Sequence, residues 1–196
     1  MKLYLFRHGE TDYNKEGRIQ CSMDIELNET GIKQAKRNAE LLKDAGIEHI
    51  YSSPLKRAYK TGKIVADFLG VEIEKLEGIR EINGGQYEGM LKTEFKKVFG
   101  EDNYETFFHT RNGGMDLSIS DEETKQHIRD RVVNTINDIC KNSKYNTIAI
   151  ASHGLILREF LRGFDFEDDS GVKNCEIIEA EYSNGKLTVL RRIANQ

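Results

Sequence analysis

The chain has 196 residues, of which 38% are hydrophobic and 32% are charged, and its formal net charge at pH 7 is −4. This balance is typical of a folded globular protein and excludes a disordered or collagen-like chain. The apolar runs span only a few residues, whereas a transmembrane helix needs roughly 20, so we expect no membrane partner. The net charge is negative, whereas a protein that binds nucleic acid usually carries excess positive charge, so we expect no nucleic-acid partner.

The cysteines and the amino-terminal residues both indicate a cytoplasmic protein. Cys21, Cys140 and Cys175 are widely spaced and form no C-x-x-C pair, which argues against a zinc site and against a disulfide framework. The short apolar stretch before Arg7 cannot form the core of a secretory signal, which takes roughly 7–15 residues. We therefore expect a cytoplasmic location.

Along most of the chain, the hydrophobic pattern alternates between predicted strands and predicted helices. The predicted strands are 2–7, 47–52, 71–76, 147–152 and a terminal hairpin of 176–182 and 187–193. The predicted helices are 30–45, a helix capped by Ser53 that runs from Pro54 to Leu69, 121–141 and 154–161. The alternation predicts a three-layer α/β/α sandwich with a mostly parallel central sheet and helices on both faces.

Residues 84–120 fit this alternation poorly, because glycines at 84–85, 100 and 113–114 interrupt short helical pieces. In open α/β sheets, ligands bind beyond the carboxyl ends of the strands. We therefore expect an insertion over about residues 84–120 that forms a lid there. The chain has a single proline and no linker-like segment, so we expect one domain over residues 1–196.

Three of the predicted strands lead into residues that suit anion chemistry. The first strand ends in Arg7 and His8, the second leads to Arg57 one turn into the next helix, and the strand 147–152 leads to His153. A lone histidine after a strand is usually structural, and a helix arginine is usually solvated. Two histidines and an arginine that converge on one sheet edge indicate a phosphate site, where arginine can bind two oxygens at once.

The segments around these strand ends resemble the histidine phosphatase superfamily, also called the phosphoglycerate mutase-like superfamily, and within it the phosphatase branch. The matching residues lie in order along nearly the whole chain. They are Arg7-His8-Gly9-Glu10-Thr11 with Asn14, Ser52-Ser53-Pro54-Leu55 with Arg57, Ala58 and Thr61, Arg80-Glu81-Ile82 with Gly85 and Tyr87-Glu88-Gly89, Ser152-His153-Gly154, and Asn174.

The resemblance implies a phosphoric monoester hydrolase that needs no metal and no cofactor and acts on a small phosphorylated metabolite. His8 would be the nucleophile that becomes phosphorylated. Arg7, Arg57 and His153 would stabilise charge on the transferring phosphoryl group. The implied phosphate-binding residues also include Asn14, Gln20, Cys21 and Gly154.

The leaving alkoxide needs a proton, and the second step needs a base that activates water; one carboxylic acid can do both. The resemblance assigns this role to Glu81, with Glu88 as the fallback. A structural alternative for Glu81 is a salt bridge to a nearby arginine. Cys21 stands where many relatives have glycine, and we expect it to be a plain packing thiol.

The predicted lid bears on the choice between a phosphatase and a cofactor-dependent phosphoglycerate mutase. A mutase must hold bisphosphorylated ligands, which requires extra cations. Between Met90 and Glu123 there are four basic and eight acidic residues, a net charge of −4. We therefore favour a phosphatase. Alpha-ribazole phosphate, sugar phosphates and a broad substrate range all stay open, as does the oligomeric state.

Two functions outside this class agree less well with the sequence. His8-Gly9-Glu10 resembles the H-x-E of zinc deaminases, but the chain has no P-C-x-x-C to complete the metal site. A catalytically silent module that binds phosphorylated ligands should lack the nucleophile or the acid. Both His8 and Glu81 are present, so an enzyme is the better interpretation.

Overall fold

The computed structural model describes residues 1–108, 125–166 and 170–195, and these form a six-stranded sheet in the order β3-β2-β4-β1-β5-β6. Its strands are β1 (Lys2–Arg7), β2 (His49–Ser52), β3 (Glu72–Lys75), β4 (Thr147–Ser152), β5 (Ile177–Ser183) and β6 (Lys186–Ile193). The strands β1 to β4 pair in parallel, while the hairpin of β5 and β6 is antiparallel and joins the sheet beside β1. The sheet is therefore mixed and mostly parallel, as predicted.

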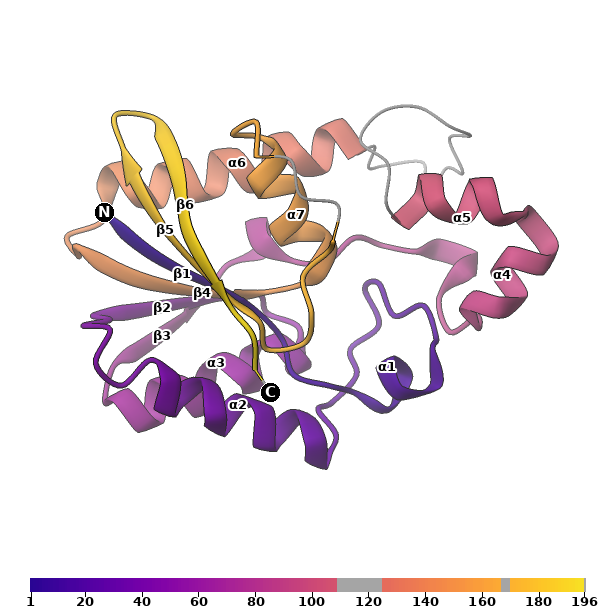
Figure 1. The fold of residues 1–196 in the computed structure, drawn as a ribbon, viewed down its shortest axis with the longest axis horizontal. Helices are drawn as coiled ribbons and strands as arrows, with labels where there is room; N and C mark the ends of the chain where they lie inside the picture. The colour runs from indigo at the N-terminus through magenta and orange to yellow at the C-terminus, as the bar shows by residue number, and fades with distance from the viewer. Residues whose placement is uncertain (109–124, 167–169, 196) are drawn as a thin grey trace.

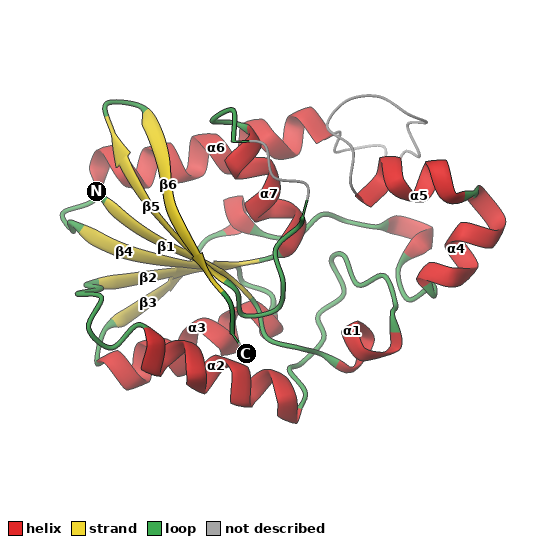
Figure 2. Ribbon diagram, in the orientation of Figure 1, coloured by secondary structure: helices red, strands yellow, loops and turns green. Residues whose placement is uncertain are grey.

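Helices cover both faces of this sheet (Figure 1). The helices α2 (Glu29–Leu41) and α3 (Lys56–Leu69) lie on one face, and α6 (Lys125–Asn142) and α7 (Gly154–Arg162) lie on the other. Shorter elements lie beyond the carboxyl ends of the parallel strands, on the right in Figure 2: α1 (Asp12–Glu16), α4 (Lys92–Phe99) and α5 (Glu101–Phe108). Two 3-10 turns, η1 (Glu77–Ile79) and η2 (Gly85–Tyr87), precede α4. The arrangement confirms the predicted α/β/α layers.

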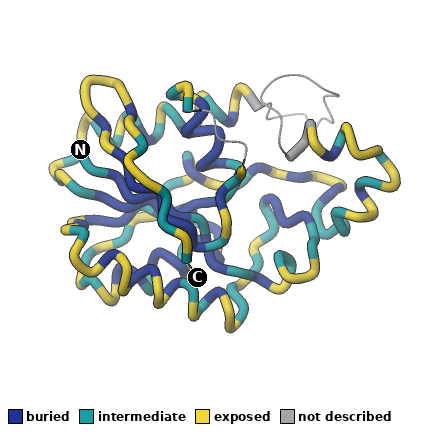
Figure 3. Tube along the Cα trace, in the orientation of Figure 1, coloured by how far each residue is buried: buried dark blue, intermediate teal, exposed yellow. Residues whose placement is uncertain are grey.

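The central strand β1 is buried on both sides because its alternate side chains enter two separate cores (Figure 3). Leu3 and Leu5 belong to the core that includes side chains of α6 and α7. Tyr4 and Phe6 belong to the core that includes side chains of α2 and α3. Each such side chain contributes about 1.5–3 kcal/mol when fully buried, so this strand is firmly held.

The start of α3 differs from the prediction. The helix begins at Lys56 rather than at Pro54, and its N-cap residue is Leu55, which makes no side-chain cap. Ser53 does not cap this helix. Instead, the backbone N–H of Lys56 donates to a carboxylate oxygen of Asp24 over 2.7 Å. A carboxylate from another loop therefore meets this helix N-terminus, where the exposed N–H groups favour negative charge.

Other boundaries shift by a few residues. The helix predicted over 30–45 ends at Leu41, and the five-residue α1 was not predicted. Of the helix predicted over 121–141, residues 121–124 lie outside the part of the chain that the structure describes. The same holds for residues 109–120 of the predicted lid. The remaining lid residues, 84–108, form η2, α4 and α5.

Candidate active site

The two predicted histidines meet at the carboxyl edge of the sheet. Arg7 is in register with Ser152 in the parallel ladder of β1 and β4, so His8 and His153 leave the sheet side by side. Their ring centroids are 5.3 Å apart, and the rings are tilted by 58°. The sheet register alone therefore produces the convergence that the sequence predicted.

A glycine follows His8 because the backbone passes very close to the start of α2. A Cβ atom at Gly9 would lie 2.5 Å from the carbonyl oxygen of Gly31. The N–H of Gly9 also donates to the Thr61 hydroxyl over 3.0 Å. This crossing fixes the direction in which the His8 side chain leaves the strand.

The hydrogen bonds of His8 define which ring nitrogen can react. Its Nδ1 lies 2.7 Å from the carbonyl oxygen of Gly9, which can only accept, so Nδ1 carries the proton and Nε2 carries the lone pair. Burial, followed by the charges of Arg57 and Arg7, holds the pKa of His8 well below its usual value. A neutral imidazole with a free lone pair is the form that can attack phosphorus.

Arg57 is fully buried and is held in place by three contacts. Its Nη1 and Nη2 donate to the backbone carbonyls of Met23 and Cys21 over 2.6 and 2.7 Å, and its Nε donates to Nε2 of His8 over 3.3 Å. Burial lowers the pKa of Arg57 to about 10, so it stays a cation at neutral pH. The two terminal nitrogens of Arg57 are therefore hydrogen-bonded to backbone carbonyls, and its Nε faces His8.

Arg7 and His8 are also anchored from the loop that precedes β5. Arg7 Nη1 donates to the carbonyl of Val172 over 2.9 Å. The side-chain amide of Asn174 donates to the His8 carbonyl over 3.0 Å and to Oδ1 of Asn14 over 3.2 Å. Residues from both ends of the sequence thus hold the arginine and the histidine together.

His153 lies beside His8 but does not line the cavity described below. It is fully buried, and its Nε2 lies 2.7 Å from the Ser53 hydroxyl oxygen. Burial, with Arg57 as the next cause, holds its pKa well below the usual value, so it is neutral. Its role as a phosphate ligand stays a prediction. The hydroxyl of Ser53 was expected to cap α3 and instead contacts this ring.

The two candidate carboxylates occupy different environments. Glu81 lines the cavity, and burial raises its pKa above the usual value, against the opposing charge of Arg57. Glu88 does not line it; its Oε1 accepts from the N–H and hydroxyl of Ser22 and from the N–H of Gly84, at 2.7–2.9 Å. The geometry therefore favours Glu81 as the proton donor, while Glu88 holds two loops together.

The remaining predicted phosphate ligands all line the same cavity: Asn14, Gln20, Cys21 and Gly154. Gln20 accepts a hydrogen bond from the Thr11 hydroxyl over 2.9 Å. Cys21 has a φ of 42°, in the left-handed region that favours glycine. This backbone conformation explains why glycine suits the position. Burial raises the pKa of its thiol, which keeps the sulfur protonated.

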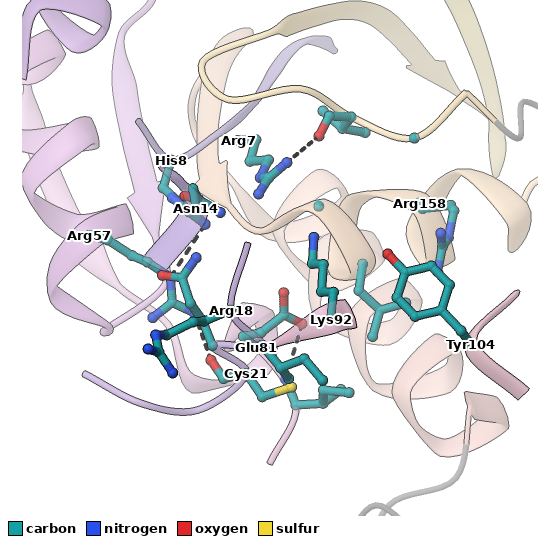
Figure 4. Close-up of a pocket in the computed structure, with 17 residues that line it drawn as sticks. Arg7, His8, Asn14, Arg18, Cys21, Arg57, Glu81, Lys92, Tyr104 and Arg158 are labelled. Atoms are coloured by element: carbon teal, nitrogen blue, oxygen red, sulfur yellow. Dashed lines mark hydrogen bonds between the residues drawn. The ribbon is translucent and has the colours of Figure 1, made fainter. Parts of the chain in front are cut away.

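The cavity has a volume of about 230 Å³ and is lined by Arg7 and His8 at the carboxyl end of β1 (Figure 4). Four of its polar lining residues were not predicted as site residues: Arg18, Lys92, Tyr104 and Arg158. The charged lining residues that the structure describes are five cations, Arg7, Arg18, Arg57, Lys92 and Arg158, and one carboxylate, Glu81. The cavity is thus suited to an anionic ligand, even though the chain as a whole is acidic.

Comparison with known proteins establishes the family. The family model described as the histidine phosphatase superfamily (branch 1) matches residues 3–195. The chain belongs to this superfamily. One relative is phosphoglycerate mutase-like protein 4 of Arabidopsis thaliana, with 35% identity over 160 residues, which cover 80% of this chain and 68% of the relative. Another is phosphoserine phosphatase 1 of Hydrogenobacter thermophilus, with 33% identity over 158 residues, 81% of this chain and 73% of the relative.

Among solved structures, a phosphoserine phosphatase mutant from Entamoeba histolytica in complex with phosphoserine superimposes with a TM-score of 0.80. The two sequences are 29% identical, and the match covers 100% of this chain and 98% of the other. The family and the fold that the sequence motifs implied are therefore both confirmed. No helix within the described residues is long and apolar enough to cross a membrane.

Proposed function

We propose that this protein is a phosphomonoester hydrolase that works through a phosphohistidine formed at Nε2 of His8. The observation that carries the proposal is the hydrogen bond from His8 Nδ1 to the Gly9 carbonyl, which leaves Nε2 with its lone pair. The lowered pKa of His8 keeps that nitrogen unprotonated at neutral pH. Glu81, with its raised pKa, lines the same cavity and supplies the acid.

In the first step, Nε2 of His8 attacks phosphorus while the bond from phosphorus to the ester oxygen breaks. Protonated Glu81 gives its proton to the leaving oxygen, so the product alcohol departs neutral. In the second step, the Glu81 carboxylate takes a proton from water, whose oxygen attacks phosphorus. The N–P bond breaks, the electron pair returns to Nε2, and inorganic phosphate is released.

The cationic residues stabilise the charge on the phosphoryl oxygens during both steps. Arg7 and Arg57 are the strongest donors near His8, and they are pre-oriented by their backbone contacts. In the proposal, His153 assists as a neighbouring donor. Further oxygen contacts come from the residues at the cavity wall, namely Asn14, Gln20, Cys21 and Gly154.

Hydrolysis is favoured over mutase activity. The Arabidopsis relative carries a mutase-like name and the Hydrogenobacter relative is named a phosphatase, so the names alone do not decide. Residues 90–123, which contain most of the predicted lid, have a net charge of −4 by sequence, which disfavours retention of a bisphosphate. The proposal therefore includes release of inorganic phosphate from a small phosphomonoester as the main outcome. It also includes a cytoplasmic location and a single domain over residues 1–196.

The test is phosphate release from a panel of phosphomonoesters in the presence of a chelator. Release should persist with chelator, and acid-labile phosphate should be detected on the protein after an alkaline quench. His8→Ala should abolish both, whereas His127→Ala, at an exposed position on α6, should change neither. Full turnover in His8→Ala would overturn the mechanism. Isomerisation of 3-phosphoglycerate without net release would instead indicate a mutase, and binding without turnover would indicate a silent module.

A further inference from the structure

The loop of residues 170–176, which precedes β5, holds two of the site residues in place. The carbonyl oxygen of Val172 accepts a hydrogen bond from Arg7, which Figure 4 marks with a dashed line. The side-chain amide of Asn174 donates to the carbonyl oxygen of His8. Val172 also lines the cavity. The position of this loop therefore helps to determine where Arg7 and His8 lie.

Arg192, near the end of β6, binds this loop although it is not among the described residues that line the cavity. Its Nε donates to Oε1 of Glu176 over 2.7 Å, and its Nη1 donates to the hydroxyl of Ser170 over 2.8 Å. Its Nη2 donates to the carbonyl oxygen of Gly171. One guanidinium thus joins the two ends of the loop through three of its nitrogens.

The contacts between the guanidinium and the loop are largely withdrawn from water. The Arg192 side chain is 19% exposed, and Glu176 is buried. The second carboxylate oxygen of Glu176 accepts from the backbone N–H of Lys173 over 2.8 Å. Cys175 has a φ of 55°, in the left-handed region that a side chain disfavours. The loop conformation therefore depends on contacts from outside the loop, and charged hydrogen bonds of this kind are strong and directional.

We propose that Arg192 is a positioning residue for the phosphate site: by clamping residues 170–176, it holds the Val172 carbonyl where Arg7 is aligned with the phosphoryl oxygens. The proposal rests on the phosphatase function above and adds a residue that acts through the loop rather than on the ligand. The planar guanidinium suits this task because it donates in several fixed directions at once. A displacement of about 1 Å in a positioning group can lower a rate by about 10²-fold.

The test compares Arg192→Met with Arg191→Met. Arg191 is the neighbouring residue on β6 and pairs with the buried Glu179 of β5 over 2.5 Å, so its loss removes the same charge and a comparable ion pair outside the loop. Arg192→Met should lower the affinity for inorganic phosphate, measured by calorimetric titration, by about tenfold. It should lower kcat/KM for p-nitrophenyl phosphate by about 10–100-fold. Arg191→Met should change each quantity by less than about twofold.

A double-mutant cycle shows whether Arg192 acts through Arg7. Arg7→Met alone should weaken phosphate binding. Adding Arg192→Met to it should weaken binding by less than about twofold more, because the clamped loop then has no guanidinium to align. A role confined to the stability of the fold would not produce this pattern. Additive losses of affinity would overturn the proposal.

Arg192→Lys keeps the test informative if thermal unfolding shows that Arg192→Met does not fold. A lysine retains the charge but not the three donor directions, so phosphate affinity should still fall by several-fold. Phosphate affinity within about twofold of the unmodified protein, in either variant when folded, would overturn the clamp and leave the phosphatase proposal standing. A tenfold loss of affinity together with no turnover in the unmodified protein would support the clamp and overturn the proposed function. Absence of phosphate binding to the unmodified protein would overturn both.

Discussion

The Nε of Arg57 donates to the Nε2 of His8 over 3.3 Å, so a buried cation faces the ring nitrogen that holds the lone pair. Burial, followed by the charge of Arg57, lowers the pKa of His8, and this contact places a hydrogen-bond donor beside the proposed nucleophilic nitrogen. The backbone carbonyls of Cys21 and Met23 hold the other two guanidinium nitrogens. The position of Arg57 is thus determined before any ligand binds.

Arg57→Lys should lower kcat/KM by about 10²–10³, the cost of losing one pre-oriented donor. A lysine ammonium keeps the charge but cannot match the three directions in which Arg57 donates. Steady-state kinetics would measure the effect, and thermal unfolding of the variant would show whether the fold is retained. A folded variant that keeps its activity within a few-fold would contradict this role.

Glu81→Gln should affect substrates according to their leaving groups. Glutamine cannot give a proton to a departing alkoxide, so kcat/KM for an alkyl phosphate should fall by about 10²–10⁴. An aryl phosphate such as p-nitrophenyl phosphate, whose leaving group departs without a proton, should lose much less in the same assay. Glu88→Gln is the matched comparison and should reduce stability rather than produce this leaving-group pattern, because Glu88 bonds to Ser22 and Gly84.

The buried histidines should make the protein less stable in mild acid. Burial lowers the pKa of both His8 and His153, so the unfolded chain binds protons that the folded chain does not. The free energy of unfolding should therefore decrease as the pH falls below about 6.5, the ordinary histidine pKa. Urea titrations between pH 7 and pH 5 would measure this slope.

His153→Gln is the variant that isolates this effect. It should lower the number of protons that the protein takes up on unfolding by up to one. Equal slopes in the unmodified protein and in His153→Gln would show that His153 is not the group that resists protonation.

Gly84→Ala should destabilise the protein through Cys21. A Cβ atom at Gly84 would lie 2.6 Å from the Cys21 sulfur and 2.9 Å from Cγ of Glu88. Overpacking of this kind costs about 1–3 kcal/mol. The double variant Gly84→Ala with Cys21→Gly should recover part of the loss, since it removes the sulfur and relaxes the left-handed backbone at residue 21. Denaturant unfolding of Gly84→Ala, Cys21→Gly and the double variant would show no recovery if another contact causes the loss.

The parts of the site that follow from strand ends could be predicted from the sequence, whereas the parts that depend on packing could not. Buried apolar runs identified β1 and β4 at their observed bounds, and a parallel ladder then brings His8 and His153 together. Ser53 before a proline is typical of a helix cap, but here the His153 ring engages its hydroxyl. A local pattern cannot report a partner 100 residues away.

Lys92, Tyr104 and Arg158 could not be assigned to the cavity from sequence for a related reason. The place of α4 depends on how its aromatic side chains pack: Phe95 contacts Tyr87 and Tyr104, with ring centroids 5.4 and 6.3 Å apart. Such contacts join segments that lie apart in the sequence, and the hydrophobic pattern of one segment does not indicate which other segment it packs against. The choice between Glu81 and Glu88 likewise required the structure, because both are acidic residues of one short segment.

The anchoring of His8 by Asn174 sets an order of events during protein synthesis. The two residues are 166 positions apart, so at about 5–20 residues per second the histidine leaves the ribosome roughly 10–30 s before its anchor. During that interval β1 also lacks its neighbours β4 and β5, which are both made late. The nascent chain therefore carries His8 without its anchor during this interval, and the proposed nucleophile gains its final setting only after Asn174 has been made.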